Sequence, residues 1–166
     1  MNLINHMAPL FDAPAFTSNK EHSSVSLEAL RGKWVLLFFY PLDFTFVCPT
    51  EIKELQKSAD QFKSKNCEVL TVSVDSTYSH EAWVKSDLGE VSFDMVSDIT
   101  KRMARDYGVL DENSGVALRG TFLIDPEGRV QYSLCHNLSV GRNIPEILRT
   151  LEALQTGELC FANWEK

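Results

Sequence analysis

The stretch WVLLFFYPLDFTFVCPTEI, residues 34–52, passes from an apolar run through a loop to the first turn of a helix. Its first seven residues are all apolar, which is typical of a central strand covered on both faces. Beyond the loop, apolar side chains recur at helical spacing: Ile52, Leu55, Ala59 and Phe62. This pattern predicts an amphipathic helix over about residues 48–65. Cys48 therefore lies where the loop becomes a helix.

The remaining patterns extend this strand and helix into a mixed sheet. Alternating apolar residues at 70–74 predict a second strand, which completes a β-α-β unit. A hairpin is expected for residues 121–134, because Asp-Pro-Glu-Gly at 125–128 favours a turn. Further predicted elements are helices over about 80–88, 99–107 and 143–154 and an extended piece over 91–96. This order indicates an α/β protein with a thioredoxin-like fold, in which helices flank both faces of a central mixed β-sheet.

Length and composition indicate one globular domain. A chain of 166 residues buries roughly 70% of the surface that it exposes when unfolded. Hydrophobic residues make up 44% and charged residues 23%, which is typical of globular proteins and argues against disorder. We expect a domain over residues 1–155 and a short C-terminal tail over residues 156–166.

Charge and hydropathy limit the partners and the compartment. The net charge of −7 disfavours binding to nucleic acid, because phosphate recognition needs clustered cations. No apolar run is long enough to cross a bilayer, so no membrane partner is expected. The N-terminus lacks a basic region and a continuous apolar stretch, and thus does not resemble a secretory signal. We therefore expect the protein in the cytoplasm.

The four cysteines, at positions 48, 67, 135 and 160, form no C-x-x-C pair and do not cluster with the histidines. A zinc site is therefore not expected. In a reducing compartment a structural disulfide framework is not expected either. Packing and thiol chemistry remain, and for Cys67 and Cys135 we favour packing.

Cys48 is the candidate for thiol chemistry. Pro49 suits the first position of a helix, so Cys48 should lie at or next to the N-cap. The sulfur then faces unpaired backbone N–H groups, which favour the thiolate, a strong nucleophile. The alternative is that Cys48 is a small buried hydrophobic residue. Thr45, three residues earlier, has a hydroxyl that could donate to the sulfur or to a bound oxygen, or simply stabilise the loop.

Glu51 stands where the second cysteine of a thioredoxin C-x-x-C motif would be, which excludes an internal two-cysteine shuttle at this helix. Its negative charge also opposes thiolate formation unless a cation compensates it. Arg119 and Arg142 are the candidates. Arg119 comes just before the predicted strand at 121–124, and from the sequence alone it is either buried with an acid or exposed at the strand end.

Several ordered blocks of the sequence resemble one family. Pro41, Thr45 and Cys48 match the peroxiredoxin motif P-x-x-x-T-x-x-C, and FYPLDFTFVCPTE is similar to typical 2-Cys peroxiredoxins of the alkyl hydroperoxide reductase C type. Further matching blocks are SVDS with HEAW at 73–83, ALRGTFLID at 117–125, VGR at 140–142, and GELC with NW at 157–164. The resemblance covers essentially the whole chain.

This resemblance implies a thiol peroxidase that reduces hydrogen peroxide and organic hydroperoxides. Cys48 matches the peroxidatic cysteine, which attacks the O–O bond and becomes a sulfenic acid. Thr45 and Arg119 match the residues that bind the peroxide and stabilise the departing oxygen. Pro41 matches the residue that shields the sulfur from water. No flavin, haem, metal or other cofactor is implied, because sulfur performs the redox step.

The resemblance also implies supporting residues and partners. Glu51 and Arg142 match a network that orients the catalytic arginine. Cys160 matches the resolving cysteine, which forms a disulfide with Cys48 of the partner subunit in a homodimer. The dimers of the family associate into a decamer, and thioredoxin or a dedicated flavoprotein disulfide reductase recycles the disulfide. The tail that carries Cys160 is a mobile place well suited to this rearrangement.

The chain departs from the family pattern in several places. Phe161 replaces the usual proline, the connection before Gly157 is shorter than usual, and Ser-Asp-Leu-Gly at 86–89 replaces Gly-Gly-Leu-Gly. The Gly-Gly-Leu-Gly element and a further C-terminal tail are the features that leave many relatives open to overoxidation. Because this sequence has neither, we expect an enzyme that resists inactivation by excess peroxide. An oligomeric holdase chaperone or a peroxide sensor is the alternative function.

Overall fold

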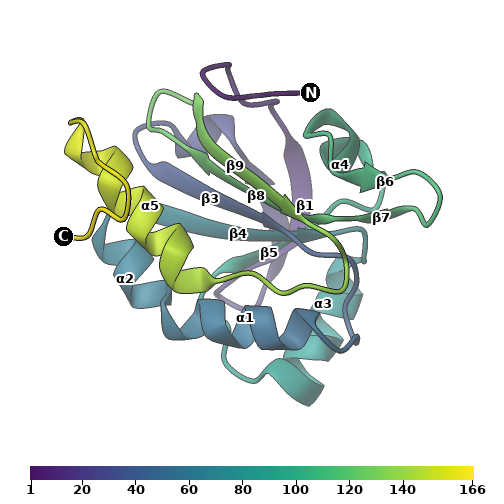
Figure 1. Cartoon of the computed structure of the whole chain (residues 1–166). Helices are drawn as coiled ribbons and strands as arrows, with labels where there is room; N and C mark the ends of the chain where they lie inside the picture. The colour runs from purple at the N-terminus through teal and green to yellow at the C-terminus, as the bar shows by residue number, and fades with distance from the viewer.

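The computed structural model describes all 166 residues. A seven-stranded sheet with the order β2-β1-β5-β4-β3-β8-β9 forms its centre (Figure 1). Strands β3, β4 and β5 are parallel, and the other neighbours are antiparallel. The strands are β1 Asp12–Phe16, β2 His22–Ser26, β3 Trp34–Phe39, β4 Cys67–Ser73, β5 Asp94–Ser97, β8 Arg119–Ile124 and β9 Val130–His136. A small second sheet pairs β6 Leu110–Asp111 with β7 Val116–Ala117.

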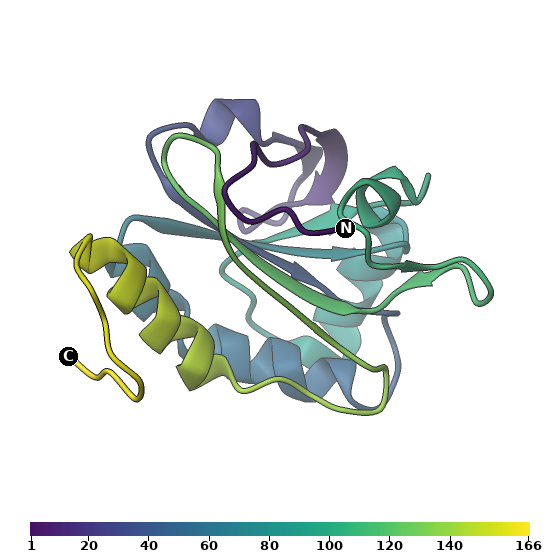
Figure 2. The same ribbon diagram turned by 45° about the horizontal axis from the view of Figure 1, so that its top comes forward.

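Helices cover both faces of the sheet, as the sequence predicted for a thioredoxin-like fold (Figures 1 and 2). Side chains of α1, α2, α3 and α5 share one hydrophobic core with one sheet face. The other face packs against α4 and the N-terminal segment. The helices are α1 Cys48–Lys57, α2 Ala59–Ser64, α3 Thr77–Trp83, α4 Arg102–Asp106 and α5 Ile144–Thr156, with a 3-10 turn η1 Glu28–Leu30 and a π-helical turn η2 Val84–Leu88.

Strand β3 is central, and both of its faces are buried. Leu36 and Phe38 point into the core beneath α1, while Leu37 and Phe39 point into the opposite core. All four side chains have an exposed fraction of 0%. The continuous apolar run therefore predicted this strand correctly. Its C-terminal end delivers the chain to the loop that precedes α1.

Several features differ from the prediction. The small β6–β7 sheet was not predicted, and the helix expected over 99–107 is shorter, Arg102–Asp106. The single helix expected over residues 48–65 is divided at Ser58, where φ is −98° and ψ is 0°. The N-terminal hairpin of β1 and β2 was not predicted at all. Its sequences, DAPAF and HSSVS, contain a proline and several small polar residues, so they lack the apolar alternation by which a strand is recognised.

Thr71, in the middle of β4, offers a test of core energetics. Its Oγ1 is buried and has no hydrogen-bond partner, and an unpaired buried hydroxyl costs about 1–3 kcal/mol. We expect Thr71→Val to raise the free energy of unfolding by about 1 kcal/mol in a denaturant titration. Thr121→Val is the matched control, because the equally buried hydroxyl of Thr121 accepts a hydrogen bond from Arg142. That variant should be less stable than the wild type, and a loss of stability in Thr71→Val would contradict the expectation.

Candidate active site

Cys48 is the first residue of α1 and follows the N-cap residue Val47. The helix thus begins where the sequence predicted, with Pro49 second, and the prediction that Cys48 lies at or next to the N-cap is confirmed. The exposed fraction of its side chain is 0%. The Cys48 Sγ accepts a hydrogen bond from Arg119 Nη1 at 3.3 Å.

Arg119 begins β8 and is buried, with an exposed fraction of 3%. Its Nη1 also donates to Glu51 Oε2 at 2.8 Å, and its Nε donates to the carbonyl oxygen of Leu138 at 2.8 Å. Of the two alternatives left open by the sequence, the structure therefore shows the buried one. Strand β8 makes this contact possible because it pairs directly with β3, whose end leads to the Cys48 loop.

Arg142 binds the same carboxylate from the other side. Its Nε and Nη2 donate to Glu51 Oε1 and Oε2 at 2.8 and 2.9 Å, and its backbone N–H donates to Oε1 at 2.9 Å. Its Nη1 donates to the Gly120 carbonyl and to Thr121 Oγ1. The guanidinium also lies over the Phe38 ring, with Cζ 3.4 Å from the ring centroid. The Glu51 carboxylate therefore accepts four hydrogen bonds, counting that from Arg119.

The buried cluster carries a surplus positive charge beside the sulfur of Cys48. Burial alone would raise the pKa of Glu51, but the hydrogen bonds and charge of Arg142, with the charge of Arg119, lower that pKa below its ordinary value. Burial lowers the pKa of Arg142, and the charge of Glu51 opposes this. Two guanidinium groups and one carboxylate leave one uncompensated positive charge. A thiolate at Cys48 brings the buried cluster to neutrality.

The loop between β3 and α1 carries Pro41, which is buried, and Thr45, which is half-buried. The Thr45 hydroxyl donates to the Leu42 carbonyl at 2.9 Å. Of the two alternatives that the sequence left open for this hydroxyl, the structure therefore shows the hydrogen bond that stabilises the loop. Because a hydroxyl has one proton, Thr45 Oγ1 is left as an acceptor for any further partner.

Asp43 anchors this loop, a role that sequence reasoning missed. Its carboxylate accepts hydrogen bonds from the Tyr40 hydroxyl at 2.6 Å and from Ser79 Oγ at 2.8 Å, and it contacts His80 Nδ1 at 2.8 Å. Its backbone N–H donates to Asp75 Oδ2 at 2.9 Å. Tyr40, Asp75 and His80 lie within blocks matched by the family pattern. A single aspartate in a loop gives no sequence pattern that would reveal such a role.

The other cysteines lie in different surroundings. Cys67, on β4, is buried, and burial raises its pKa to about 12, so its thiol stays protonated at neutral pH. Cys135 is exposed on the edge strand β9. Cys160 is half-buried in the tail beyond α5, where its Sγ lies 3.6 Å from the Ala153 carbonyl oxygen. In both views the tail folds back on the end of α5, far from the start of α1 (Figures 1 and 2).

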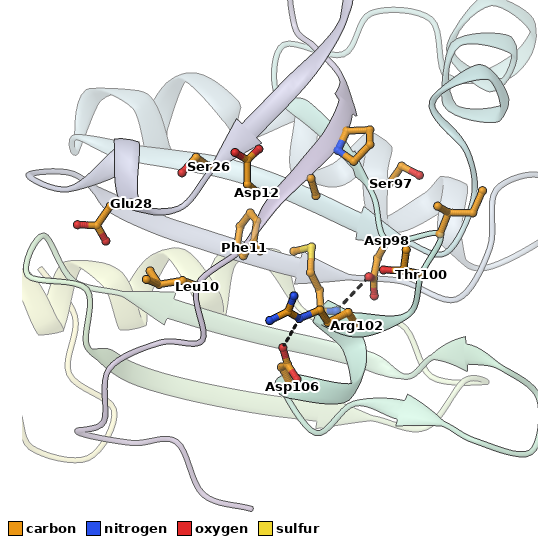
Figure 3. A pocket seen from close by; sticks show the side chains of 14 residues that line it. Leu10, Phe11, Asp12, Ser26, Glu28, Ser97, Asp98, Thr100, Arg102 and Asp106 are labelled. Atoms are coloured by element: carbon orange, nitrogen blue, oxygen red, sulfur yellow. Dashed lines mark hydrogen bonds and ion pairs between the residues drawn. The ribbon is translucent and has the colours of Figure 1, made fainter.

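A separate cavity of about 500 Å³ lies between residues 10–14 and α4 and contains none of the cysteines (Figure 3). The Asp98 carboxylate at its wall accepts hydrogen bonds from the backbone of Met103 and Ala104. Arg102 pairs with Asp106 at 3.5 Å.

The structure contains no group of three or more His, Cys, Asp or Glu side chains arranged to hold a metal. None of its helices combines the length and apolar character required to span a membrane.

Comparisons with known proteins define the class to which this fold and site belong. The model of the AhpC/TSA family matches residues 4–133. The chain is 45% identical to a putative peroxiredoxin in the rubredoxin operon of Clostridium pasteurianum, covering 99% of this chain and 96% of that protein. It is 47% identical to the mitochondrial thioredoxin-dependent peroxide reductase of Homo sapiens, over 97% of this chain and 66% of that protein.

Solved structures agree with these sequence relatives. The reduced 2-Cys peroxiredoxin of Plasmodium vivax superposes with a TM-score of 0.96 at 43% identity, covering 99% of this chain and 90% of that one. AhpC of Enterococcus faecalis gives a TM-score of 0.92 at 40% identity, covering 97% and 99%. The chain therefore belongs to the AhpC/TSA family. Within it, the chain is a typical 2-Cys peroxiredoxin, an enzyme that reduces hydroperoxides.

Proposed function

We propose that Cys48 is the peroxidatic nucleophile of this enzyme. The observation that carries the proposal is the 3.3 Å contact between Cys48 Sγ and Arg119 Nη1 inside a cluster that has one uncompensated positive charge. The thiolate attacks the nearer peroxide oxygen, so that an S–O bond forms as the O–O bond breaks. The departing oxygen takes up a proton and leaves as water or an alcohol, and Cys48 becomes a sulfenic acid.

The neighbouring residues have distinct roles in this proposal. Arg119 stabilises the charge that moves from the sulfur to the departing oxygen. Thr45 accepts a hydrogen bond from the O–H of the hydroperoxide, because its own proton is used by Leu42. Pro41 shields the sulfur from water. Hydrogen peroxide and organic hydroperoxides both carry the required O–H group.

Glu51 and Arg142 are positioning residues. Glu51 holds Arg119 through its Oε2, and Arg142 fixes both oxygens of the Glu51 carboxylate. Arg142 in turn is held by the Gly120 carbonyl on β8. The position of Arg119 is thus fixed by contacts from α1 and from the segment between β9 and α5.

Cys160 is the proposed resolving cysteine, and it acts on Cys48 of a partner subunit. Its thiol displaces the sulfenic oxygen as water and forms the disulfide. Two observations support an intersubunit pair: the tail over residues 156–166 lies away from the start of α1 in its own chain, and the outer edge of β9 has no strand partner. A second copy that pairs along β9 gives a homodimer.

The remaining parts of the proposal come from relatives. A peroxiredoxin structure from Plasmodium yoelii is described as an artifactual octamer, and the human relative is named for its dependence on thioredoxin. For this chain we propose that dimers associate, up to a decamer. We also propose that thioredoxin or a flavoprotein disulfide reductase reduces the disulfide. The cytoplasm, where such reductants operate, is the proposed compartment.

One experiment tests the assignment of both cysteines. Wild type, Cys48→Ser and Cys160→Ser are treated with one equivalent of hydrogen peroxide and compared by non-reducing gel electrophoresis and intact mass. Of these three proteins, the wild type alone should form a covalent dimer, while Cys160→Ser should accumulate sulfenic acid at Cys48. Cys67→Ser serves as the control and should behave like the wild type. A covalent dimer in Cys160→Ser would show that another cysteine resolves the intermediate.

A further inference from the structure

Phe44, in the loop that precedes Cys48, has an unusual backbone conformation. Its φ is +58°, in the left-handed region that disfavours residues with a Cβ. Six non-glycine residues share this property: Asn5, Lys20, Phe44, Asn66, Lys101 and Asn163. Asparagine tolerates this region well, whereas a bulky aromatic residue is a genuine outlier. Phe44 is the one aromatic residue among the six, and it lies four residues before the proposed nucleophile.

The contacts around Phe44 explain how this conformation persists. On one side, Asp43 is fixed by Tyr40, Ser79 and the backbone contact to Asp75. On the other side, the Thr45 hydroxyl ties the chain back to Leu42. A strained residue persists only when its surroundings determine its conformation in this way.

The side chain of Phe44 adds little that would offset the strain. Its exposed fraction is 56%. Its ring meets Trp83 at a centroid distance of 6.1 Å and an interplanar angle of 43°. The hydrogen bonds of its neighbours, rather than burial of its own ring, therefore hold the residue in place.

The closed loop also seals the sulfur. Cys48 has an exposed fraction of 0%, so a thiol from another subunit cannot reach it. A disulfide requires Cα atoms within about 7 Å of each other. The loop and the first turn of α1 must therefore open before Cys160 of a partner subunit can react.

We propose that the left-handed strain at Phe44 is a built-in bias toward opening of this loop. The strain raises the energy of the closed state only, because an opened loop lets Phe44 return to an ordinary conformation. It therefore increases the opened fraction without changing any residue that contacts the peroxide. The link to disulfide formation rests on the proposed roles of Cys48 and Cys160, whereas the effect on loop opening does not.

A pair of variants isolates the backbone contribution. Phe44→Ala and Phe44→Gly both remove the ring and its contact with Trp83, but only glycine relieves the strain. The left-handed penalty destabilises the closed loop of Phe44→Ala, whereas the extra chain entropy of glycine favours the opened loop of Phe44→Gly. Because the first effect is the larger, we expect the opened fraction of Phe44→Gly to be about threefold smaller than that of Phe44→Ala. Opening is measured on the reduced protein as the rate at which iodoacetamide alkylates Cys48, with peptide mass mapping to separate the other cysteines.

The second measurement is the rate of covalent dimer formation after one equivalent of peroxide. This rate is followed after Cys48 has been fully converted to the sulfenic acid, and it should then be lower in Phe44→Gly than in Phe44→Ala by the same factor as alkylation. The control pair is Lys101→Ala and Lys101→Gly, because Lys101 has a φ of +62° but lies at the start of α4. This pair should alkylate Cys48 at equal rates.

The outcomes separate this inference from the proposed function. Equal alkylation rates in the two Phe44 variants, or faster alkylation in the glycine variant, would overturn the inference. A difference of the same size in the Lys101 pair would also overturn it, because the effect would then be global. A slower alkylation in Phe44→Gly with no covalent dimer in any variant, wild type included, would uphold the strain and instead refute the pairing of Cys48 with Cys160.

Discussion

Replacing Arg119 with methionine is expected to lower the second-order rate constant for oxidation of Cys48 by hydrogen peroxide by about 10²–10³-fold. Methionine keeps much of the side-chain length but removes the donor at 3.3 Å from the sulfur and the charge next to the departing oxygen. It also leaves only one guanidinium beside Glu51, so the cluster no longer has a surplus positive charge. Rapid quenching with a sulfenic acid trap, followed by mass spectrometry, gives the rate constant.

Arg105→Met is the matched control, because Arg105 also pairs with a glutamate, Glu112, but on the surface. This variant should retain the wild-type rate. Arg119→Lys should fall between the wild type and Arg119→Met, since one ammonium group cannot donate to Leu138, Glu51 and the sulfur in the same geometry. A wild-type rate in Arg119→Met would remove Arg119 from the mechanism.

The second large effect concerns stability. Glu51→Ala is expected to lower the free energy of unfolding by about 3–5 kcal/mol, because it leaves two buried guanidinium groups facing each other without their carboxylate. The side chains of Glu51, Arg119 and Arg142 have exposed fractions of 2%, 3% and 0%, so water cannot replace the lost partner. Chemical denaturation monitored by tryptophan fluorescence and circular dichroism provides the measurement.

The control is Glu112→Ala, which breaks the exposed pair with Arg105 and should lower the free energy of unfolding by no more than about 1 kcal/mol.

The pH dependence of stability gives an independent check. The pKa of Glu51 is lower in the folded protein than its ordinary value of 4.5. Its stabilising contribution is therefore complete above about pH 4.5 and is lost as the pH falls through the folded pKa. The stability difference between wild type and Glu51→Gln should shrink over this acid range, and a constant difference would contradict the ion-pair account.

The sequence predicted the position of Cys48 because local signals fix it. A continuous apolar run must be a central strand, and Pro49 must lie in the first turn of a helix. Both signals act over a few residues, and their joint consequence is the placement of the thiol next to an N-cap. The family pattern then pointed to the remaining site residues.

The contact between Arg119 and Cys48 could not be predicted from local physics, because 71 residues separate the two side chains. It depends on the antiparallel pairing of β8 with β3, which no residue pattern specifies. The Asp43 anchor escaped prediction for a related reason. Its partners come from the residue after β3, from α3 and from the turn after β4, and only the assembled sheet brings them together.

The surplus positive charge of the buried cluster has a consequence for the equilibrium as well as for the rate. In the proposed sulfenic acid and disulfide states of Cys48, the sulfur carries no negative charge and the two arginines are compensated only by Glu51. Reduction returns the sulfur to a thiolate and makes the cluster neutral again. The cluster therefore favours reduction of the disulfide. The reduction potential of the Cys48 pair should accordingly be higher, and thus more oxidising, than that of a disulfide without neighbouring cations. Equilibration with a glutathione buffer would reveal a lower value if the cluster played no such part.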